Sequence, residues 1–440
     1  MSERTPIAAD HHSLVASAAG PAEGGSRMFR TLTALGLLVA ALSPANAQTQ
    51  DKSGHYLFVF SGDQKGAGKD FLAVIDADPA SSTYGHLVTS VATDQVSIRP
   101  HHTEYVMPAD GMLFANDFDA GRTFVFDLRD PLHPKVATEF SERDGYAFPH
   151  SFVRLPDGHV LATFQYKSGA MPMHGNMMDG ATNRSGTITG GLVELDDSGH
   201  ALRAGSSADA AFPDAALEPY SLAVLPDIDR VLVTNSPMQN DALLRSNTAQ
   251  LWRLSDLKLL KTFRLDPGEQ LYAQTSPEEA RIGPDGAVYV QTLACGLERV
   301  SGLADDQPKA QLVYTFPGTW CGVPTFDGHY LIESVPDLHG YIVLDMSDGV
   351  HPREVSRLVI SPDYAAHWTG LDRRTGRIVI TSEREGDRTY VLKLDSATGV
   401  LSIDTAFRGE DGQPGFSFAT RKWPHGWTGA GKPHGAVFSR

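Results

Sequence analysis

The sequence predicts an all-β fold, a seven-bladed β-propeller closed by a blade that mixes N-terminal and C-terminal strands. Three observations favour this fold. The 440 residues include 42 glycines and 27 prolines, which leaves little room for long helices. From residue 55 onward, short β-branched and aromatic runs alternate with turn residues. One strand motif also recurs along the chain at a spacing typical of propeller blades.

The recurring motif is a first strand followed by an Asp-containing turn and a second strand. It is clearest at residues 102–108, 150–156 and 220–226, which read HTEYVMP, HSFVRLP and YSLAVLP. The same register begins again at positions 278, 320 and 367, so we expect six four-stranded units. Propeller blades typically repeat every 40–50 residues or so, and longer intervals are absorbed by loops.

Strands from the two ends of the chain are expected to form the seventh unit. Residues 56–60, 71–76 and 86–91 predict three strands, and residues 433–438 repeat the first-strand motif. Closing the ring in this way removes the two exposed edges of the sheet array. An array of two-sheet sandwiches is the alternative, but it does not explain why the last strand repeats the first-strand motif.

The amino-terminal segment has the pattern of an export signal. Residues 1–27 are expected to be disordered or to precede the true start at Met28. Residues 28–47 combine a positive residue, an apolar run of eleven residues and a small-x-small site, which predicts a signal peptide cleaved near Ala47-Gln48. Residues 48–440 then form a single propeller domain, periplasmic or secreted, with no membrane span in the mature chain.

The charge of the chain excludes one class of partner. Lys and Arg number 37 and Asp and Glu number 53, a formal net charge of −16. Such an acidic surface repels phosphate backbones and anionic lipids. Nucleic acid is therefore not an expected partner, and a small molecule is.

The two cysteines leave two possibilities open. Cys295 and Cys321 could form one disulfide in an oxidising compartment. Two separate buried thiols are the alternative.

Histidines recur at one position of the repeat. The first strand of each blade lines the central channel of a propeller, so equivalent positions form a ring around it. That position holds, in order along the chain, His102, His150, Tyr220, Glu278, Trp320, His367 and His434. The four histidines come from neighbouring blades, and His101 adds a fifth imidazole.

These imidazoles predict a metal site. We expect the ligands to be His101, His102, His150, His367 and His434. Imidazole suits copper, the first choice, with zinc, iron or calcium as alternative ions. The competing interpretation is that each histidine is a polar plug in a water-filled channel.

Two acidic residues are candidate catalytic groups. Glu278 and Glu279 lie at the equivalent first-strand position of another blade, across the predicted channel from the histidines. A carboxylate there could transfer protons. The alternative is a solvated pair at the channel mouth.

A second group of soft ligands lies in the loop after residue 170. Its members are Met171, Met173, His174, Met177 and Met178. Thioethers favour Cu(I), so this loop is a secondary copper candidate. An adaptable apolar lid over the channel mouth is the alternative and is compatible with copper binding.

Signatures of other chemistries are missing from the sequence. There is no Gly-x-Ser-x-Gly elbow, phosphate-binding glycine loop, Cys-x-x-Cys-His or His-Glu-x-x-His. No motif therefore supports nucleophilic hydrolysis or nucleotide chemistry, and no organic cofactor site is expected.

One segment resembles a known family. Residues 71–85, FLAVIDADPASSTYG, are similar to the first strand and turn of the selenium-binding protein family, whose bacterial members include copper-dependent methanethiol oxidases. The His101-His102 pair, His150 and residues 190–196 are also similar to family features, as is the turn at 345–352. The cysteine pair associated with selenium binding is absent, so selenium binding is not implied.

The resemblance implies a function. Family members oxidise methanethiol with oxygen and water to formaldehyde, hydrogen sulfide and hydrogen peroxide. The first hypothesis is therefore an exported copper-dependent oxidase of a small thiol, an oxidoreductase with oxygen as acceptor. The second is a non-catalytic periplasmic propeller that binds a metal or a protein partner. A sugar-lactone hydrolase is a third hypothesis, although it would need harder, acidic ligands. The oligomeric state is left open.

Overall fold

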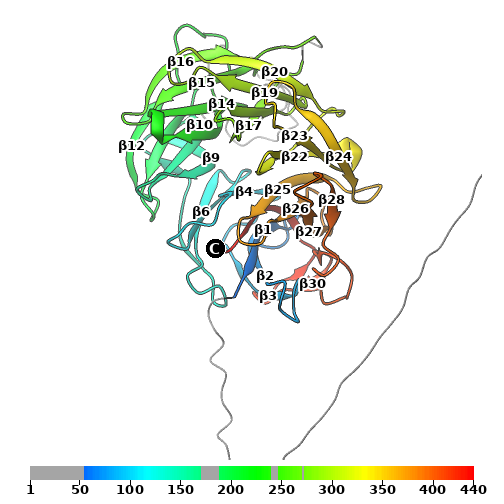
Figure 1. Ribbon diagram of the computed structural model, residues 1–440. Helices are drawn as coiled ribbons and strands as arrows, with labels where there is room; N and C mark the ends of the chain where they lie inside the picture. Colours follow the sequence, from blue (N-terminus) through cyan, green and yellow to red (C-terminus); the bar gives the residue numbers. More distant parts are fainter. Residues whose placement is uncertain (1–53, 170–187, 239–245, 270–271) are drawn as a thin grey trace, which may run out of the picture. The chain divides into compact units, whose positions relative to one another are not determined.

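Strands account for most of the regular structure in the described part of the chain. The computed structural model describes residues 54–169, 188–238, 246–269 and 272–440. Within these ranges, seven antiparallel sheets form the predicted seven-bladed β-propeller (Figure 1). The predictions for the amino-terminal segment and for the methionine loop at 171–178 lie outside the described residues. Among the described residues there is no helix with the length and apolar character that a membrane crossing needs.

The closing blade joins the two ends of the described chain, as predicted. Its strands are β1 (Tyr56–Gly62), β2 (Phe71–Asp76), β3 (Leu87–Ala92) and β32 (Lys432–Phe438), in the order β3-β2-β1-β32. Strand β32 pairs antiparallel with β1, and it also contacts inner strands of the two neighbouring blades.

The other six blades follow in chain order, and each begins with its inner strand, apart from the short strand β8 that precedes β9. The first three contain β4 (Pro100–Thr103), β5 (Met112–Asp117), β6 (Arg122–Asp127) and β7 (Lys135–Phe140); β8 (Glu142–Arg143), β9 (Tyr146–Arg154), β10 (Val160–Lys167), β11 (Gly191–Leu195) and β12 (Ala201–Ser206); and β13 (Pro219–Leu225), β14 (Arg230–Asn235), β15 (Thr248–Arg253) and β16 (Lys258–Arg264). The short strand β8 gives the second of these sheets a fifth strand in addition to the four expected.

The remaining three blades complete the ring. They contain β17 (Pro277–Ile282), β18 (Val288–Thr292), β19 (Gly296–Ser301) and β20 (Lys309–Thr315); β21 (Thr325–Asp327), β22 (Tyr330–Val335), β23 (Gly340–Asp345) and β24 (Arg353–Val359); and β25 (Ala366–Asp372), β26 (Arg377–Ser382), β27 (Arg388–Leu394), β28 (Leu401–Ile403) and β29 (Phe416–Ser417). A hairpin of β30 (Arg421–Lys422) and β31 (Thr428–Gly429) and two 3-10 turns, Pro226–Ile228 and Pro336–Leu338, are the other elements.

One expected first strand is shorter than predicted. The repeat placed its start at Trp320, but β21 begins only at Thr325. Trp320 lies in the loop before it. This loop is fastened by a disulfide between Cys295 and Cys321, which decides between the two states expected for the cysteines.

Apolar side chains pack between neighbouring blades. One cluster contains Phe58, Phe60 and Leu72 of the closing blade and Phe124 and Phe126 of the next. These side chains are fully buried. Because each cluster of this kind spans two sheets, the hydrophobic effect holds the blades against one another and gives the channel a rigid wall.

A β-bulge interrupts the inner strand β4 at His101 and His102. In the β4 blade, Pro100 pairs with Asp117 and Thr103 with Ala115, so His101 and His102 together lie opposite one residue, Asn116. The inner strands β9, β13, β17, β25 and β32 have the same one-residue irregularity. A bulge changes the direction of the side chains it contains, and here it directs polar side chains toward the channel.

The bulge corrects the predicted register. The sequence comparison aligned His102 with His150, but the residue that follows the paired proline is His101 in β4 and His150 in β9. His101 is therefore the equivalent of His150, and His102 occupies the second bulge position. The error of one residue arose because the two adjacent histidines of β4 look alike in sequence, whereas strand pairing distinguishes them.

Candidate metal centre

Four imidazole rings from three inner strands meet in the interior. The ring centroids of His101 and His102 are 4.0 Å apart, and His101 lies 4.5 Å from His434 and 5.0 Å from His150. His102 lies 4.8 Å from His150 and 5.6 Å from His434. All four side chains are at most 5% exposed. Residues that are far apart in the sequence thus form one compact group, which we call the imidazole cluster.

His367 lies at the border of this cluster. Its ring is 4.5 Å from that of His434 and 6.3 Å from that of Trp320. Within the described part of the chain, its ring stacks on none of the other three histidines. The five predicted ligands are therefore brought together, with His434 between His367 and the rest.

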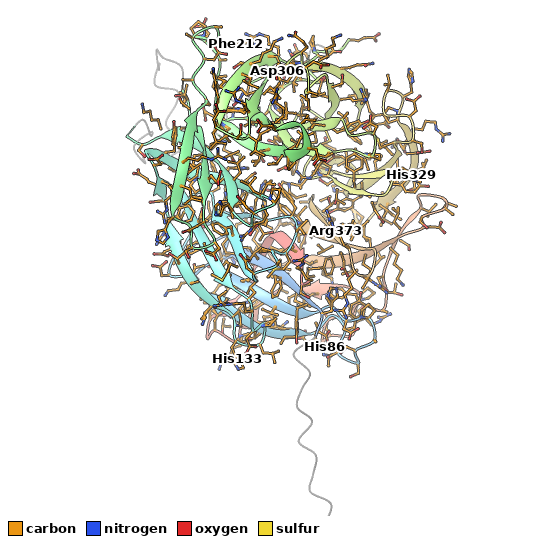
Figure 2. The ribbon with its side chains drawn as sticks, turned by 60° about the vertical axis from the view of Figure 1, so that its left-hand side comes forward. His86, His133, Phe212, Asp306, His329 and Arg373 are labelled. Carbon is orange, nitrogen blue, oxygen red and sulfur yellow. A yellow bond between two sulfur atoms is a disulfide. The ribbon has the colours of Figure 1, made fainter. Side chains whose placement is uncertain are left out.

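Several buried ring nitrogens have no hydrogen-bond partner among the described residues. They are Nδ1 of His101, both nitrogens of His102, Nε2 of His150, both nitrogens of His367 and Nδ1 of His434. A buried polar atom without a hydrogen-bond partner lowers the stability of the folded state. A group of such atoms in one place therefore indicates a binding site for a ligand. His133, which lies outside the cluster, differs: its side chain is 82% exposed and bonds to Asp130 (Figure 2).

Two of the imidazoles are oriented by a second group. Nδ1 of His150 donates a hydrogen bond to the carbonyl oxygen of Tyr220 at 3.0 Å. Nε2 of His434 donates to the carboxylate of Glu383 at 3.1 Å. In each ring the opposite nitrogen is left with its lone pair free. Metal-binding histidines are held in this way, by a carbonyl or a carboxylate on the other nitrogen.

Burial keeps the imidazoles neutral. It lowers the pKa of His150 and of His434 to about 4. The pKa values of His101 and His102 are also well below the ordinary value, first because of burial and then because of the neighbouring imidazoles. A neutral ring offers a lone pair to a metal ion, so at neutral pH the cluster is ready to bind one.

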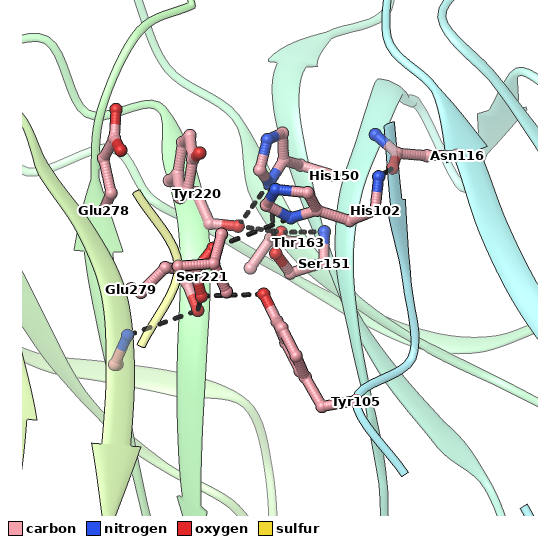
Figure 3. Close-up of polar contacts among 12 residues, drawn as sticks. His102, Tyr105, Asn116, His150, Ser151, Thr163, Tyr220, Ser221, Glu278 and Glu279 are labelled. Atoms are coloured by element: carbon pink, nitrogen blue, oxygen red, sulfur yellow. Dashed lines mark hydrogen bonds and ion pairs between the residues drawn. The ribbon is translucent and has the colours of Figure 1, made fainter. Parts of the chain in front are cut away.

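The bulge backbone is held by polar side chains of the second strand. The side-chain oxygen of Asn116 accepts the backbone N–H of His102 at 2.8 Å, and its NH₂ group donates to the carbonyl of Pro149 at 3.2 Å (Figure 3). Thr163 bonds likewise to the N–H of Ser151 and to the carbonyl of Tyr220. A polar residue in a buried strand is the sequence signal that could have revealed these links between blades.

Glu279, one of the two predicted catalytic carboxylates, reaches the cluster. Its Oε2 accepts hydrogen bonds from the hydroxyl of Tyr105 at 2.7 Å, from Ser221 at 3.1 Å and from the guanidinium of Arg281 at 2.8 Å (Figure 3). Its Oε1 lies 3.6 Å from Nδ1 of His102. The three donors fix the carboxylate beside the imidazole.

Glu278, the other predicted carboxylate, points elsewhere. Figure 3 shows its carboxylate directed away from Glu279 and His102. Burial, followed by the charges of Glu279 and Glu383, raises its pKa well above the ordinary value, which favours the protonated form. The two adjacent glutamates therefore have different surroundings.

Sequence reasoning missed two further glutamates. Glu383 directly follows β26 and contacts both His434 and His367. Glu333, within β22, is fully buried, and burial raises its pKa well above the ordinary value. A single acidic residue in the otherwise apolar run YLIESV is a signal for Glu333, but the position of Glu383 depends on how two blades pack.

An aromatic wall separates the cluster from a surface pocket. The rings of Tyr105 and Trp368 stack at 5.0 Å, and Trp368 lies 5.1 Å from His102. Tyr105 also lines a pocket of about 480 Å³ together with Met107, Arg154 and Leu155. None of the five histidines lines this pocket.

Comparison with known proteins gives partial matches in sequence. No family model matches the chain. It is 35% identical over 111 residues to the methanethiol oxidase of Hyphomicrobium sp. and 30% identical over 112 residues to that of Ruegeria pomeroyi. Each match covers 24% of this chain, and the chain spans about a quarter of the length of these curated relatives, 25% in each case.

Comparison of structures extends over most of the chain. The selenium-binding protein of Sulfolobus tokodaii superposes with a TM-score of 0.64 over 87% of this chain and 93% of that protein, at 15% identity. At this identity the match shows a shared fold. Together with the sequence matches, it confirms the expected resemblance: the chain is similar to the selenium-binding protein family, in sequence over about a quarter of its length and in fold over most of it.

Proposed function

We propose that this protein is a copper-dependent oxidase of a small thiol that acts after export. The observation that carries the proposal is the imidazole cluster, whose four buried rings have lone pairs without hydrogen bonds in the described structure. The sequence similarity to proteins named methanethiol oxidase supports a thiol as the substrate.

The residues present fit a copper ion. His101, His102, His150 and His434 would hold it through neutral ring nitrogens, which are good ligands for copper. Copper bound there would favour the thiolate form of a thiol and carry its electrons to oxygen. The orientation of the ligands comes from the chain itself, through the carbonyl of Tyr220 and the carboxylate of Glu383.

The chain also supplies groups for proton transfer. In the described structure, Oε1 of Glu279 accepts no hydrogen bond, and it is the atom beside His102 that would take the proton of a bound thiol. Tyr105, Ser221 and Arg281 hold the other oxygen, so the carboxylate is oriented before the substrate arrives. Glu278 takes no part in this step, because its carboxylate is directed away from His102 (Figure 3).

The burial of the cluster restricts the substrate to a small molecule. Each ring is at most 5% exposed, so a bulky thiol could not reach the nitrogens without moving an inner strand. Methanethiol fits this limit. One methanethiol, one oxygen molecule and one water molecule give one formaldehyde, one hydrogen sulfide and one hydrogen peroxide, so the reaction is balanced.

Export is supported by two observations. The segment 28–47 has the pattern of a signal peptide. The disulfide between Cys295 and Cys321 is of the kind that persists in oxidising compartments.

Metal analysis of the purified mature chain tests the metal site. We expect copper in the wild type and its loss in His150→Ala, because this change removes a ligand. His159→Ala is the matched control, since His159 lies outside the cluster and bonds to Glu194. Copper retained in His150→Ala would contradict the proposed site.

Oxygen uptake with methanethiol tests the activity. The wild type should consume oxygen and release hydrogen peroxide, and His150→Ala should lose at least 100-fold in rate. Copper binding without oxygen uptake would instead support the second hypothesis, a metal-binding propeller without catalysis.

A further inference from the structure

A second group of potential ligands adjoins the imidazole cluster. It consists of His367 in β25, Glu383 after β26 and His434 in β32, whose ligand atoms all lie within 4.8 Å of one another. Oε1 of Glu383 is 3.5 Å from Nε2 of His367 and 3.1 Å from Nε2 of His434. A separate set of three, His101, His102 and His434, meets the same distance limit.

The site has more ligands than one ion needs. Copper or zinc bound by imidazoles takes about four ligands. His101, His102, His150 and His434 already provide four rings, each of which lies within 5.0 Å of at least one other. His367 and Glu383, on the other side of His434, are then not needed as ligands of that ion.

His367 does not have the environment of a structural histidine. Its side chain is 9% exposed, and within the described residues neither ring nitrogen has a hydrogen bond. His55 is equally buried, but both of its ring nitrogens are bonded, to Ser439 at 3.1 Å and to Asp372 at 2.7 Å. A buried imidazole with neither nitrogen satisfied is missing a partner.

The orientation of His367 shows where that partner would lie. A Cβ atom placed on Gly322 would be 2.9 Å from Nδ1 of His367, so this nitrogen faces the backbone of the neighbouring blade. Nε2 faces Glu383. The Glu383 side chain is 33% exposed, so water can complete the coordination of an ion there.

We propose that His367 and Glu383 bind a second divalent cation, next to the ion of the imidazole cluster, with His434 between the two. The mixture of imidazole and carboxylate ligands suits a cation of borderline softness, Zn²⁺ or Cu²⁺. The second site goes beyond the proposed oxidase function, because cation binding at His367 and Glu383 does not require thiol oxidation.

Metal stoichiometry tests the second site. Tag-free protein is stripped with chelator, incubated with excess Zn²⁺, desalted and measured by mass spectrometry for zinc per folded chain. We expect two ions in the wild type and one in either Glu383→Gln or His367→Asn. His150→Ala should lose the ion of the imidazole cluster and retain the ion at His367.

Two controls address nonspecific binding and folding. Glu385→Gln changes a partly exposed carboxylate close in sequence that pairs with Lys65, and it should keep both ions. His159→Asn removes an imidazole of the surface group formed with Asp157 and Glu194, and it should also keep both. Thermal unfolding shows which variants are folded.

The results separate the second site from the proposed function. A wild type with one ion, or Glu383→Gln with two, would overturn the second site. Two zinc ions in a chain whose copper form takes up no oxygen with methanethiol would refute the oxidase function alone. One ion in a chain that oxidises methanethiol would refute only the second site.

Discussion

Gly435 and His101 are in backbone contact across two blades. A Cβ atom placed on Gly435 would lie 2.7 Å from the carbonyl oxygen of His101 and 2.5 Å from the backbone nitrogen of Thr103. Real Cβ atoms do not approach backbone so closely. The absence of a side chain therefore allows β32 to lie against β4, and this contact places the ring of His434 beside those of His101 and His102.

Replacing Gly435 with alanine should move the two strands apart. We expect Gly435→Ala to reduce the free energy of unfolding by about 1–3 kcal/mol, as overpacking does, and to weaken metal binding. Denaturant unfolding and metal titration measure the two effects. Gly409→Ala is a milder control, because its nearest neighbour would be 3.2 Å away. Unchanged metal affinity in Gly435→Ala would contradict this explanation of the cluster.

Asn116 should matter for metal affinity as well as for stability. Asn116→Ala leaves the N–H of His102 without its 2.8 Å acceptor, at a cost of about 1–3 kcal/mol. We expect metal affinity to fall about 10–100-fold, as it does when support of a ligand is lost. Calorimetric titration checks this value.

Thr234→Val is the matched control for Asn116→Ala. Thr234 makes the equivalent bond to the N–H of Ser221, in a blade without a histidine ligand. It should lower stability and leave metal affinity unchanged. Equal losses of affinity in the two variants would show that the effect is not specific to the histidine bulge.

The disulfide should contribute substantially to stability. Cys295 and Cys321 are separated by 26 residues, and closing a loop of this length is worth about 3.5 kcal/mol in the chain-entropy model. The double variant Cys295→Ser, Cys321→Ser should lose about that much in denaturant unfolding. Reductant should destabilise the wild type and leave the double variant unaffected; a wild type insensitive to reductant under unfolding conditions would oppose this.

Glu298 should make stability fall as the pH rises. It is fully buried in β19, and burial raises its pKa from 4.5 to about 8. The folded state then holds a proton that the unfolded state releases above pH 4.5. The stabilisation by this bound proton is complete below pH 4.5 and is lost progressively up to about pH 8, on the order of 5 kcal/mol at 1.36 kcal/mol per unit.

Glu298→Gln tests this dependence, because glutamine has no proton to lose. Urea unfolding at several pH values should show a stability difference between variant and wild type that grows in favour of glutamine from pH 5 to 8. Glu142→Gln, at an exposed position, should follow the wild type throughout. A constant difference between Glu298→Gln and the wild type would mean that Glu298 does not titrate in this range.

Local sequence patterns were sufficient to predict most of the fold. Strand β1 was expected at 56–60 and spans Tyr56–Gly62, and β2 was expected at 71–76 and spans Phe71–Asp76. Such strands show in a sequence because burial on both faces produces continuous apolar runs between turn residues. The closure of the ring by β32 was also predictable, since its motif repeats that of the other inner strands.

By itself, the sequence determined the number of blades, the closure of the ring and the histidines that line its centre, because strand periodicity and repeats are local properties. Only the tertiary structure decided that His101 is the equivalent of His150, since a bulge is defined by pairing between strands. It alone joined Cys295 to Cys321 and brought Glu383 to His434 and His367. Such contacts depend on the packing of separate strands and blades, which no local pattern encodes.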